Sequence, residues 1–310
     1  MPTYQFGHLC QRGVLNLDFK PIKLANKPLI DGFLARDAFE VADVHFNNLY
    51  LWRKAREISY AIIHDCLIIA TKYPDSTPFY FYPIGLGDKK AALQALIERA
   101  PHPLELRALQ SQHVAQLEAF FPNAFEITPM RDRFDYIYSV PELIALSGKK
   151  FHKKKNHLNA FLKTYPHFSF ESISPHNIDP LMEVLQEWHA LDDPQDVGLA
   201  QEHKGILEAL QVYDQLGMQG GVIKIGDKIV AMSFGEIIQK DMALIHIEKA
   251  SPHVRGAYQM INQQLLTHAF STCAWVNREE DLGIEGLRQA KMGYHPAYLL
   301  EKHHAILKNP

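Results

Sequence analysis

Residues 221–250, GVIKIGDKIVAMSFGEIIQKDMALIHIEKA, contain the pattern that decides the fold. Residues 221–225 and 228–237 are rich in apolar and β-branched side chains, and they flank Gly226-Asp227, a pair typical of the tight turn of a β-hairpin. Residues 242–250 form a third run of the same kind. The stretch therefore predicts a three-stranded antiparallel meander.

A second meander is predicted in the first half of the chain. Its strands are expected at residues 59–63, 66–71 and 78–84. Each meander is followed by a predicted helix, at residues 88–100 in the first half and 255–271 in the second. With a joining helix at 147–165 set aside, both halves show the order strand, two helices, meander, helix, strand, helix, strand. The first strand of the chain is expected at residues 15–22 and the last at 297–307. This repeat predicts an α+β protein of two similar units, each a mixed central sheet flanked by helices.

The length of the chain supports two domains. With 310 residues, each half is long enough to bury its own core. Pro141 interrupts the strand expected at residues 134–139, so the predicted domains are residues 1–140 and 141–310. We expect the second to contain the active cleft and the first to be a degenerate copy that closes the cleft or binds the acceptor.

Composition limits the classes of function. The net charge is −3, so any binding of nucleic acid or of an anionic membrane has to come from a local basic patch. Three dispersed cysteines, Cys10, Cys66 and Cys273, predict neither a disulfide framework nor a zinc site. Residues 1–12 lack an apolar signal core, and no apolar run approaches the roughly 20 residues of a membrane span. We therefore expect a cytoplasmic protein with no transmembrane segment.

The local basic patch is found in the joining helix, which begins with a dense run of lysines. Cations at a helix N-terminus oppose the helix dipole, so the run favours a bound anion, which the free backbone N–H groups there would help to hold. A solvated basic face is the plain alternative. The helical period of 100° per residue places Lys155 among the apolar side chains of Phe151, Leu158 and Leu162, with Lys154 at the edge. The candidate phosphate-binding residues are Lys149, Lys150, Lys153, Lys154, Lys155 and Asn156.

Polar residues also follow the strand predicted at residues 274–277. Ligands of open α/β sheets bind at the carboxyl ends of strands, so Asn277 and Arg278 are candidates to hold a carboxylate or phosphate. The acidic residues 279–281 are expected to cap the next helix, at 284–292, or to receive a cationic amino group. On the strand at 242–250, His246 and Glu248 share one face by the two-residue period, and Glu236 lies on the neighbouring strand. A satisfied polar pair at a sheet edge is the alternative there.

Four motifs resemble those of an uncharacterised bacterial family that is similar to the C-terminal domain of phosphatidylglycerol lysyltransferases. They are FNNLYLW at residues 46–52, SGKKFHKKKNH at 147–157, HIEKA at 246–250 and NREEDLG at 277–283. The element order is similar to the GNAT-like (acyl-CoA N-acyltransferase-like) fold. Two such units in tandem also resemble the peptidoglycan-bridge (Fem-type) aminoacyl transferases. Known lysyltransferases add a large membrane domain, to which nothing in this sequence corresponds.

The resemblance implies where the chemistry occurs. In that fold the acceptor meets the acyl donor beside the strand at 242–250, which implies that Glu248, with His246, takes the proton of the attacking amine. Acetyltransferases bind the coenzyme A pyrophosphate with (Arg/Gln)-x-x-Gly-x-(Gly/Ala). Residues 253–258, HVRGAY, keep only Gly256, with Arg255 beside it. These two residues are candidate anion ligands at a helix start, but the altered motif disfavours acyl-coenzyme A as the cofactor.

The predicted function is transfer of an aminoacyl group, from aminoacyl-tRNA or another phosphate-rich donor, to an amine, a hydroxyl or a lipid. Two alternatives stay open. One is an N-acetyltransferase that uses acyl-coenzyme A. The other is a non-catalytic module that binds RNA or makes peripheral contact with anionic lipid. The sequence contains no H-E-x-x-H, P-loop or G-x-S-x-G motif, and it predicts no metal site.

Overall fold

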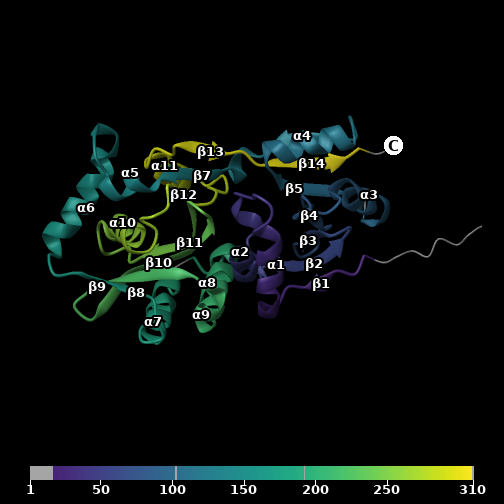
Figure 1. Cartoon of the computed structure of the whole chain (residues 1–310). Coiled ribbons are helices and arrows are strands. Elements are labelled where there is room, and N and C mark those ends of the chain that lie inside the picture. The colour runs from purple at the N-terminus through teal and green to yellow at the C-terminus, as the bar shows by residue number, and fades with distance from the viewer. Residues whose placement is uncertain (1–16, 102, 192, 309–310) are drawn as a thin grey trace, which may run out of the picture.

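The strands form two seven-stranded sheets, which lie side by side in the computed structural model (Figure 1). The structure describes residues 17–308 except 102 and 192. The first sheet has the order β1-β2-β3-β4-β5-β14-β6, and the second, from its opposite edge, β8-β9-β10-β11-β12-β7-β13. The fourth and fifth strands of each order, β4–β5 and β11–β12, pair in parallel, and the other pairs are antiparallel. The predicted repeat is therefore present in the order and direction of the strands.

The first segment of the chain supplies most of the first sheet and the helices around it. Its strands are β1 (Lys20–Pro21), β2 (Glu57–Ile63), β3 (Cys66–Lys72), β4 (Phe79–Phe81), β5 (Glu105–Leu109) and β6 (Phe125–Pro129). Its helices are α1 (Lys27–Leu34), α2 (Phe46–Trp52), α3 (Lys89–Arg99) and α4 (Ser111–Phe120). β6 was not predicted, because its run of five residues is mostly solvent-exposed and lacks a regular apolar alternation.

The remainder of the chain supplies all strands of the second sheet and one strand, β14, of the first. Its strands are β7 (Asp135–Ser139), β8 (Ser169–Ser172), β9 (Gln219–Ile225), β10 (Lys228–Gln239), β11 (Met242–Ala250), β12 (Trp275–Asn277), β13 (Tyr298–Leu300) and β14 (His303–Leu307). Its helices are α5 (Val140–Ala145), α6 (His152–Thr164), α7 (Ile178–His189), α8 (Val197–Gln211), α9 (Tyr213–Leu216), α10 (Ala257–Ala269) and α11 (Glu285–Met292). The predicted meander is β9–β10–β11, with its first turn at Gly226-Asp227.

The two units exchange one strand each. β7 precedes residue 140, yet it pairs with β12 and β13 in the second sheet. β14, at the other end of the chain, lies between β5 and β6 in the first sheet. In Figure 1 the yellow β14 accordingly runs beside the blue β5, away from its neighbour β13. A division at residue 140 therefore does not separate the strands of the two sheets.

The exchange corrects one predicted element. A single strand was expected over residues 297–307, but the chain leaves the second sheet after Leu300 and enters the first at His303. Between them Lys302 is buried, with 1% of its surface exposed. Its ammonium contacts the carboxylates of Asp43, Asp135 and Glu280. These ion pairs fix the position at which the chain passes from the second sheet to the first. The apolar pattern of residues 297–307 does not reveal this passage.

Different helices pack on the strands of the second sheet. α10 packs on β9, β10 and β11, and α5 and α6 pack on α10. α7 packs on β10 and also on α8, and α8 contacts α2 of the first segment. One apolar core therefore continues from the first sheet to α7 and α8, and a second core lies under α10.

Two expectations concern residues near the start of the chain. The absence of a signal core in residues 1–12 lies outside the described residues, as does the beginning of the strand predicted at 15–22, of which β1 is the part described. No helix in the described part of the chain is long and apolar enough to cross a membrane.

Candidate functional site

The candidate site lies where β11 and β12 separate. The two strands pair in parallel only from Met242 to Leu244 and from Trp275 to Asn277. β11 then continues to Ala250, whereas β12 ends at Asn277. Parallel strands that separate leave a space at their carboxyl ends, which is where open α/β sheets bind ligands. Glu248 and Arg278 lie on the two sides of this separation.

Arg278 and Glu248 form an ion pair in a largely buried environment. Arg278 Nη2 donates to Glu248 Oε1 at 2.9 Å, and the two side chains are 11% and 14% exposed. Asn262, on α10, donates to the other carboxylate oxygen at 3.1 Å. Burial disfavours the charged guanidinium, but the carboxylate of Glu248 holds the pKa of Arg278 above its ordinary value. Arg278 is therefore always a cation here.

Aromatic rings surround Arg278. Its guanidinium lies 4.8 Å from the ring centroid of Tyr294 and 5.6 Å from that of Tyr138, distances that allow cation–π attraction. Its Nη1 is buried, as is the hydroxyl of Tyr294, and the geometry gives neither a well-formed hydrogen bond within the described residues. The Tyr294 hydroxyl nevertheless interacts with Arg278 and Gln259. Buried donors without acceptors are costly, so these two groups are suited to an acceptor that a ligand supplies.

Two lysines adjoin the pair. Lys154, on α6, lies 4.0 Å from the Tyr294 centroid and donates to the Ala290 carbonyl at 3.1 Å. Burial, together with the nearby charge of Arg278, lowers the Lys154 pKa to about 8. Lys291 donates to the carbonyls of Arg278 and Glu280, and burial lowers its pKa to about 8 as well. The site thus contains one permanent cation and two cations that can release a proton near neutral pH.

His246 belongs to a separate network. Phe234 pairs with Ile247 and Gly235 with Ile245, so His246 is the extra residue of a β-bulge, and the simple alternation that placed it on one face with Glu248 does not hold. Its Nε2 contacts Glu236 at 3.0 Å and its Nδ1 contacts Glu279 at 3.2 Å. Burial disfavours the charged ring, but these two carboxylates raise the pKa of His246 to about 9. The ring is therefore an imidazolium at neutral pH and does not accept a proton there.

Helix α2 completes that network from the first segment. Asn47 donates to Glu236 at 2.8 Å, and Asn48 donates to Glu279 at 3.1 Å. Both asparagines are buried, and they occupy adjacent positions in the predicted FNNLYLW motif. In the sequence their signal is two polar residues among aromatics, which indicates mainly core with a polar lid and not a site. In the structure they join the two units.

The lysine run is arranged differently from the helical projection. Residues Lys149–Phe151 form a 3-10 turn, and the α-helix begins only at His152. Within α6 the spacing of 100° per residue places Lys154, Leu158 and Phe161 on one face. Phe161 is buried in place of Leu162, and Lys155 is exposed. The expectation that Lys155 turns towards the core was wrong, since Lys154 is the lysine that does so.

The other members of the run face solvent. Lys149, Lys153, Lys155 and Asn156 are exposed, and Lys150 pairs with the exposed Glu142 at 2.8 Å. Four cations therefore form an accessible basic surface on and beside the first turn of α6. Asn156 contacts the His152 ring at 3.4 Å.

Three further candidates have structural contacts. Gly256 has φ +87° at the start of α10, and a Cβ there would lie 2.4 Å from the His157 carbonyl, so this glycine lets α10 approach α6. Arg255 beside it is exposed. Asn277 is fully buried, with its amide nitrogen donating to the Glu40 carbonyl and to Asp135, both at 2.9 Å. Both donors of Asn277 are therefore used by the fold.

The acidic residues after Asn277 pair with cations. No side chain caps α11, whose N-cap is Ile284, so the predicted capping role was wrong. Glu279 contacts His246, and Glu280 pairs with Arg133 at 2.8 Å as well as with Lys302. Asp281 is fully buried and pairs with Arg131 and Arg288. These ion pairs fix the segment that carries Arg278.

One group of carboxylates has the spacing of metal ligands. Oxygens of Asp43, Asp135 and Glu280 lie within 4.8 Å of one another. Lys302 Nζ contacts all three, at 2.7 Å from Asp135 and 2.9 Å from Glu280. The carboxylates hold the Lys302 pKa well above its ordinary value against the effect of burial. The ammonium thus neutralises the charge that a metal would balance.

A family model described as phosphatidylglycerol lysyltransferase, C-terminal, matches residues 38–306. The crystal structure of a conserved protein of unknown function from Bacteroides thetaiotaomicron is similar, with a TM-score of 0.89 and 37% sequence identity. The match covers 94% of this chain and all of that one. An uncharacterized protein of Mycoplasmoides gallisepticum is 24% identical over 175 residues, and the match spans 54% of each protein, about half the length of that relative.

The C-terminal domain of a putative lysylphosphatidylglycerol synthetase from Agrobacterium fabrum has the same fold. Its TM-score is 0.61 at 14% identity, and the match covers 93% of both chains. Together with the repeated strand order, this confirms the predicted fold class of an α+β protein with two tandem units, each with a mixed sheet flanked by helices.

Proposed function

The chain belongs to the family of phosphatidylglycerol lysyltransferase C-terminal domains, as the resemblance of its motifs indicated, and from that premise we propose that it transfers an aminoacyl group from aminoacyl-tRNA to an amine, a hydroxyl or a lipid acceptor. Family and fold together support an acyltransferase. The single observation that carries the finer proposal is the buried Arg278–Glu248 pair, with the buried Arg278 Nη1 and Tyr294 hydroxyl beside it.

The chemistry requires a proton acceptor and donors for the developing oxyanion. A carboxylate accepts about four hydrogen bonds, so Glu248 keeps free lone pairs after its contacts with Arg278 and Asn262. In the proposed step the acceptor nucleophile attacks the ester carbonyl of the donor and loses its proton to Glu248. Arg278 Nη1 and the Tyr294 hydroxyl stabilise the negative oxygen, and the 3′-hydroxyl of the tRNA leaves.

Lys154 is the group placed to assist the leaving oxygen. Its pKa of about 8 means that most of the side chain is protonated at pH 7, yet the proton is held less tightly than by an ordinary lysine. We assign it the protonation of the leaving oxygen. His246, as a fixed imidazolium, positions Glu279 and the segment that carries Arg278.

The donor is proposed from the basic surface on α6. The exposed Lys149, Lys153 and Lys155 lie at the beginning of α6, whose inward-facing Lys154 reaches the Arg278 site. A polyanion that neutralises these charges would place its end near the site, with affinity that falls as salt increases. The same surface would meet an anionic lipid headgroup, which is one class of acceptor.

Donor binding tests this proposal. Thermal shift of the full chain is measured with aminoacyl-tRNA, acetyl-coenzyme A and coenzyme A at equal concentrations. We expect stabilisation by aminoacyl-tRNA that a Lys149→Gln, Lys153→Gln, Lys155→Gln variant loses. Lys163→Gln, an exposed lysine in the last turn of α6, is the matched control.

The alternatives predict other outcomes. Selective stabilisation by acetyl-coenzyme A would contradict an aminoacyl-tRNA donor and favour an acyl-coenzyme A acetyltransferase. Salt-dependent binding of RNA or anionic vesicles without turnover of any acyl donor would favour a binding module instead.

A further inference from the structure

A lined cavity lies in the first unit, apart from the Arg278 site. Its volume is about 210 Å³, and side chains of β4, β5 and the exchanged strand β14 contribute to it. It lies beside the β4–β5 parallel pair, the counterpart of the β11–β12 pair. The first unit was expected to be a degenerate copy, yet it has a cavity at the corresponding pair of strands.

Arginine side chains line this cavity and keep unused donors. Arg56 donates to the hydroxyl of Tyr73 at 3.1 Å, and no carboxylate of the described residues lies within ion-pairing distance of it. Arg107 pairs with Glu105 at 2.8 Å. The Nε groups of both arginines are buried and have no hydrogen-bond partner in the part of the chain that the structure describes. A ligand that accepts hydrogen bonds would satisfy them.

The acidic group in the wall is already neutralised. Asp43 contacts the ammonium of Lys302, and the positive charges of Lys302 and Arg56 keep the Asp43 pKa below its ordinary value although burial opposes this. Arg133, in the same lining, pairs with Glu280 behind it. Arg56 therefore remains the cation whose charge no neighbouring carboxylate balances directly, and the cavity favours an anion.

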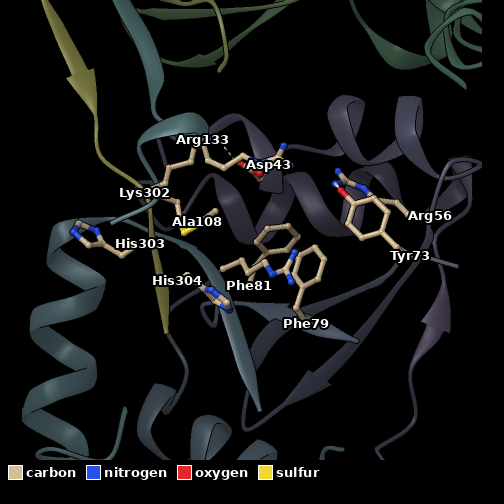
Figure 2. A pocket seen from close by; sticks show the side chains of 12 residues that line it. Asp43, Arg56, Tyr73, Phe79, Phe81, Ala108, Arg133, Lys302, His303 and His304 are labelled. Carbon is tan, nitrogen blue, oxygen red and sulfur yellow. Dashed lines mark hydrogen bonds and ion pairs between the residues drawn. The ribbon is translucent and has the colours of Figure 1, made fainter. Parts of the chain in front are cut away.

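The opposite part of the lining is aromatic. The guanidinium of Arg107 lies 4.1 Å from the ring centroid of Phe79, and the rings of Phe79 and Tyr73 are 6.1 Å apart. Figure 2 shows the rings of Phe79 and Phe81 below Asp43, with the Arg56 guanidinium next to the Tyr73 hydroxyl. Guanidinium donors above aromatic rings fit a ligand with a charged end and an apolar body.

We propose that this cavity binds a small organic anion, a phosphate or carboxylate group carried on an aromatic or apolar body. Its volume is below the roughly 300–1,000 Å³ of pockets for drug-sized ligands, which limits the body to about one ring. Arg56 and Arg107 bind the anionic group, and Tyr73 and Phe79 contact the body. This site does not depend on the proposed acyl transfer.

Isothermal titration calorimetry of the full chain tests the site with four probes: phenyl phosphate, benzoate, inorganic phosphate and phenol. We expect at least one of the first two to bind with a Kd below about 1 mM, and more tightly than inorganic phosphate or phenol. The tighter of phenyl phosphate and benzoate identifies the anionic group. Failure of both to bind, or equal binding of phenol, would overturn the proposal.

Variants locate the binding. Arg56→Gln and Arg107→Gln should each weaken the probe by about tenfold or more, since each removes a charged hydrogen bond. Arg99→Gln, an exposed arginine at the end of α3, makes the same charge change outside the cavity and should leave the Kd unchanged. If Arg56→Gln does not fold, Arg107, whose side chain is 41% exposed, carries the test. Unchanged affinity in a folded Arg107→Gln variant would refute the assignment.

Discussion

The buried ammonium of Lys302 lies among three carboxylates. Asp43, Asp135 and Glu280 all contact its ammonium, and burial raises the Asp135 pKa to about 6 even though Lys302 opposes this. Such an ion cluster costs desolvation energy, and the loss of one member leaves uncompensated buried charge. The residue therefore fixes the crossing between the sheets.

Replacing that lysine should destabilise the fold. We expect Lys302→Met to lower the free energy of unfolding by about 3–5 kcal/mol at pH 7, as for other broken buried ion pairs. Because the remaining carboxylates repel one another, part of the loss should be recovered at pH 5 as they gain protons. Urea unfolding at both pH values measures this, with the exposed Lys163→Met as control. A loss below about 1 kcal/mol would mean that the cluster is not important for stability.

Because of His246, the free energy of unfolding should fall as the pH rises into the alkaline range. Its pKa rises from an unfolded value of about 6.5 to about 9, so the folded state binds the proton more tightly. The contribution is complete below pH 6.5 and is lost as the pH rises through 9, with an upper limit of about 3 kcal/mol. In the His246→Gln variant, unfolding free energies measured from pH 6 to 9.5 should vary less than in the native chain. His253→Gln, at an exposed histidine, should leave the slope unchanged. An unchanged slope in His246→Gln would contradict the charged state.

At the scale of elements, local sequence patterns predicted the positions of strands, turns and helices well. They predicted poorly which residues of an element face the core. The Gly226-Asp227 turn, the two meanders and the helix at Asp88, whose side chain accepts from Ala91 N, follow from neighbouring residues alone. Which lysine of α6 turns inward depends on whether Phe161 or Leu162 is buried, and two adjacent apolar residues do not decide this in the sequence. Arg278 was predicted as a site residue from its place after a strand. Its neighbours Tyr138 and Tyr294 could not be predicted, because they come from distant segments.

The contact of α10 with α6 depends on one glycine. Gly256→Ala would force a side chain into a left-handed backbone conformation and into the His157 carbonyl, so we expect a loss of about 1–3 kcal/mol or more. Gly286→Ala, in α11 with open space around the new Cβ, should instead be neutral or stabilise by up to about 1 kcal/mol. Thermal unfolding compares the two variants. Equal effects would contradict the close approach of the two helices.

At the scale of the whole molecule, the strand exchange joins the two units. Sequence patterns could indicate the strands β7 and β14 but not the sheets that they enter, because pairing across hundreds of residues leaves no local signal. Asn47 and Asn48 illustrate the same limit, since their partners Glu236 and Glu279 lie in the other unit. The His246 network beside Arg278 is therefore built on contacts with both units.

Fragments test this dependence. Residues 1–140 lack β14, which leaves β5 and β6 without a shared partner, and residues 141–310 lack β7. We expect neither fragment alone to unfold cooperatively in circular dichroism, and the full chain to show one transition. Co-expression of both fragments is the control that should restore a folded complex. Cooperative melting of residues 1–140 alone, near the temperature of the full chain, would contradict the account.

The central claim is that the Arg278–Glu248 site performs acyl transfer, and single-turnover label transfer tests it most directly. Aminoacyl-tRNA labelled in its amino acid is mixed with excess protein and with vesicles that contain phosphatidylglycerol, or with a pool of small amines. The account predicts that label leaves the tRNA for an acceptor, and that Glu248→Gln slows this step by about 100-fold or more without weakening tRNA binding. Transfer at the native rate in Glu248→Gln, or no transfer by the native chain to any acceptor, would contradict it.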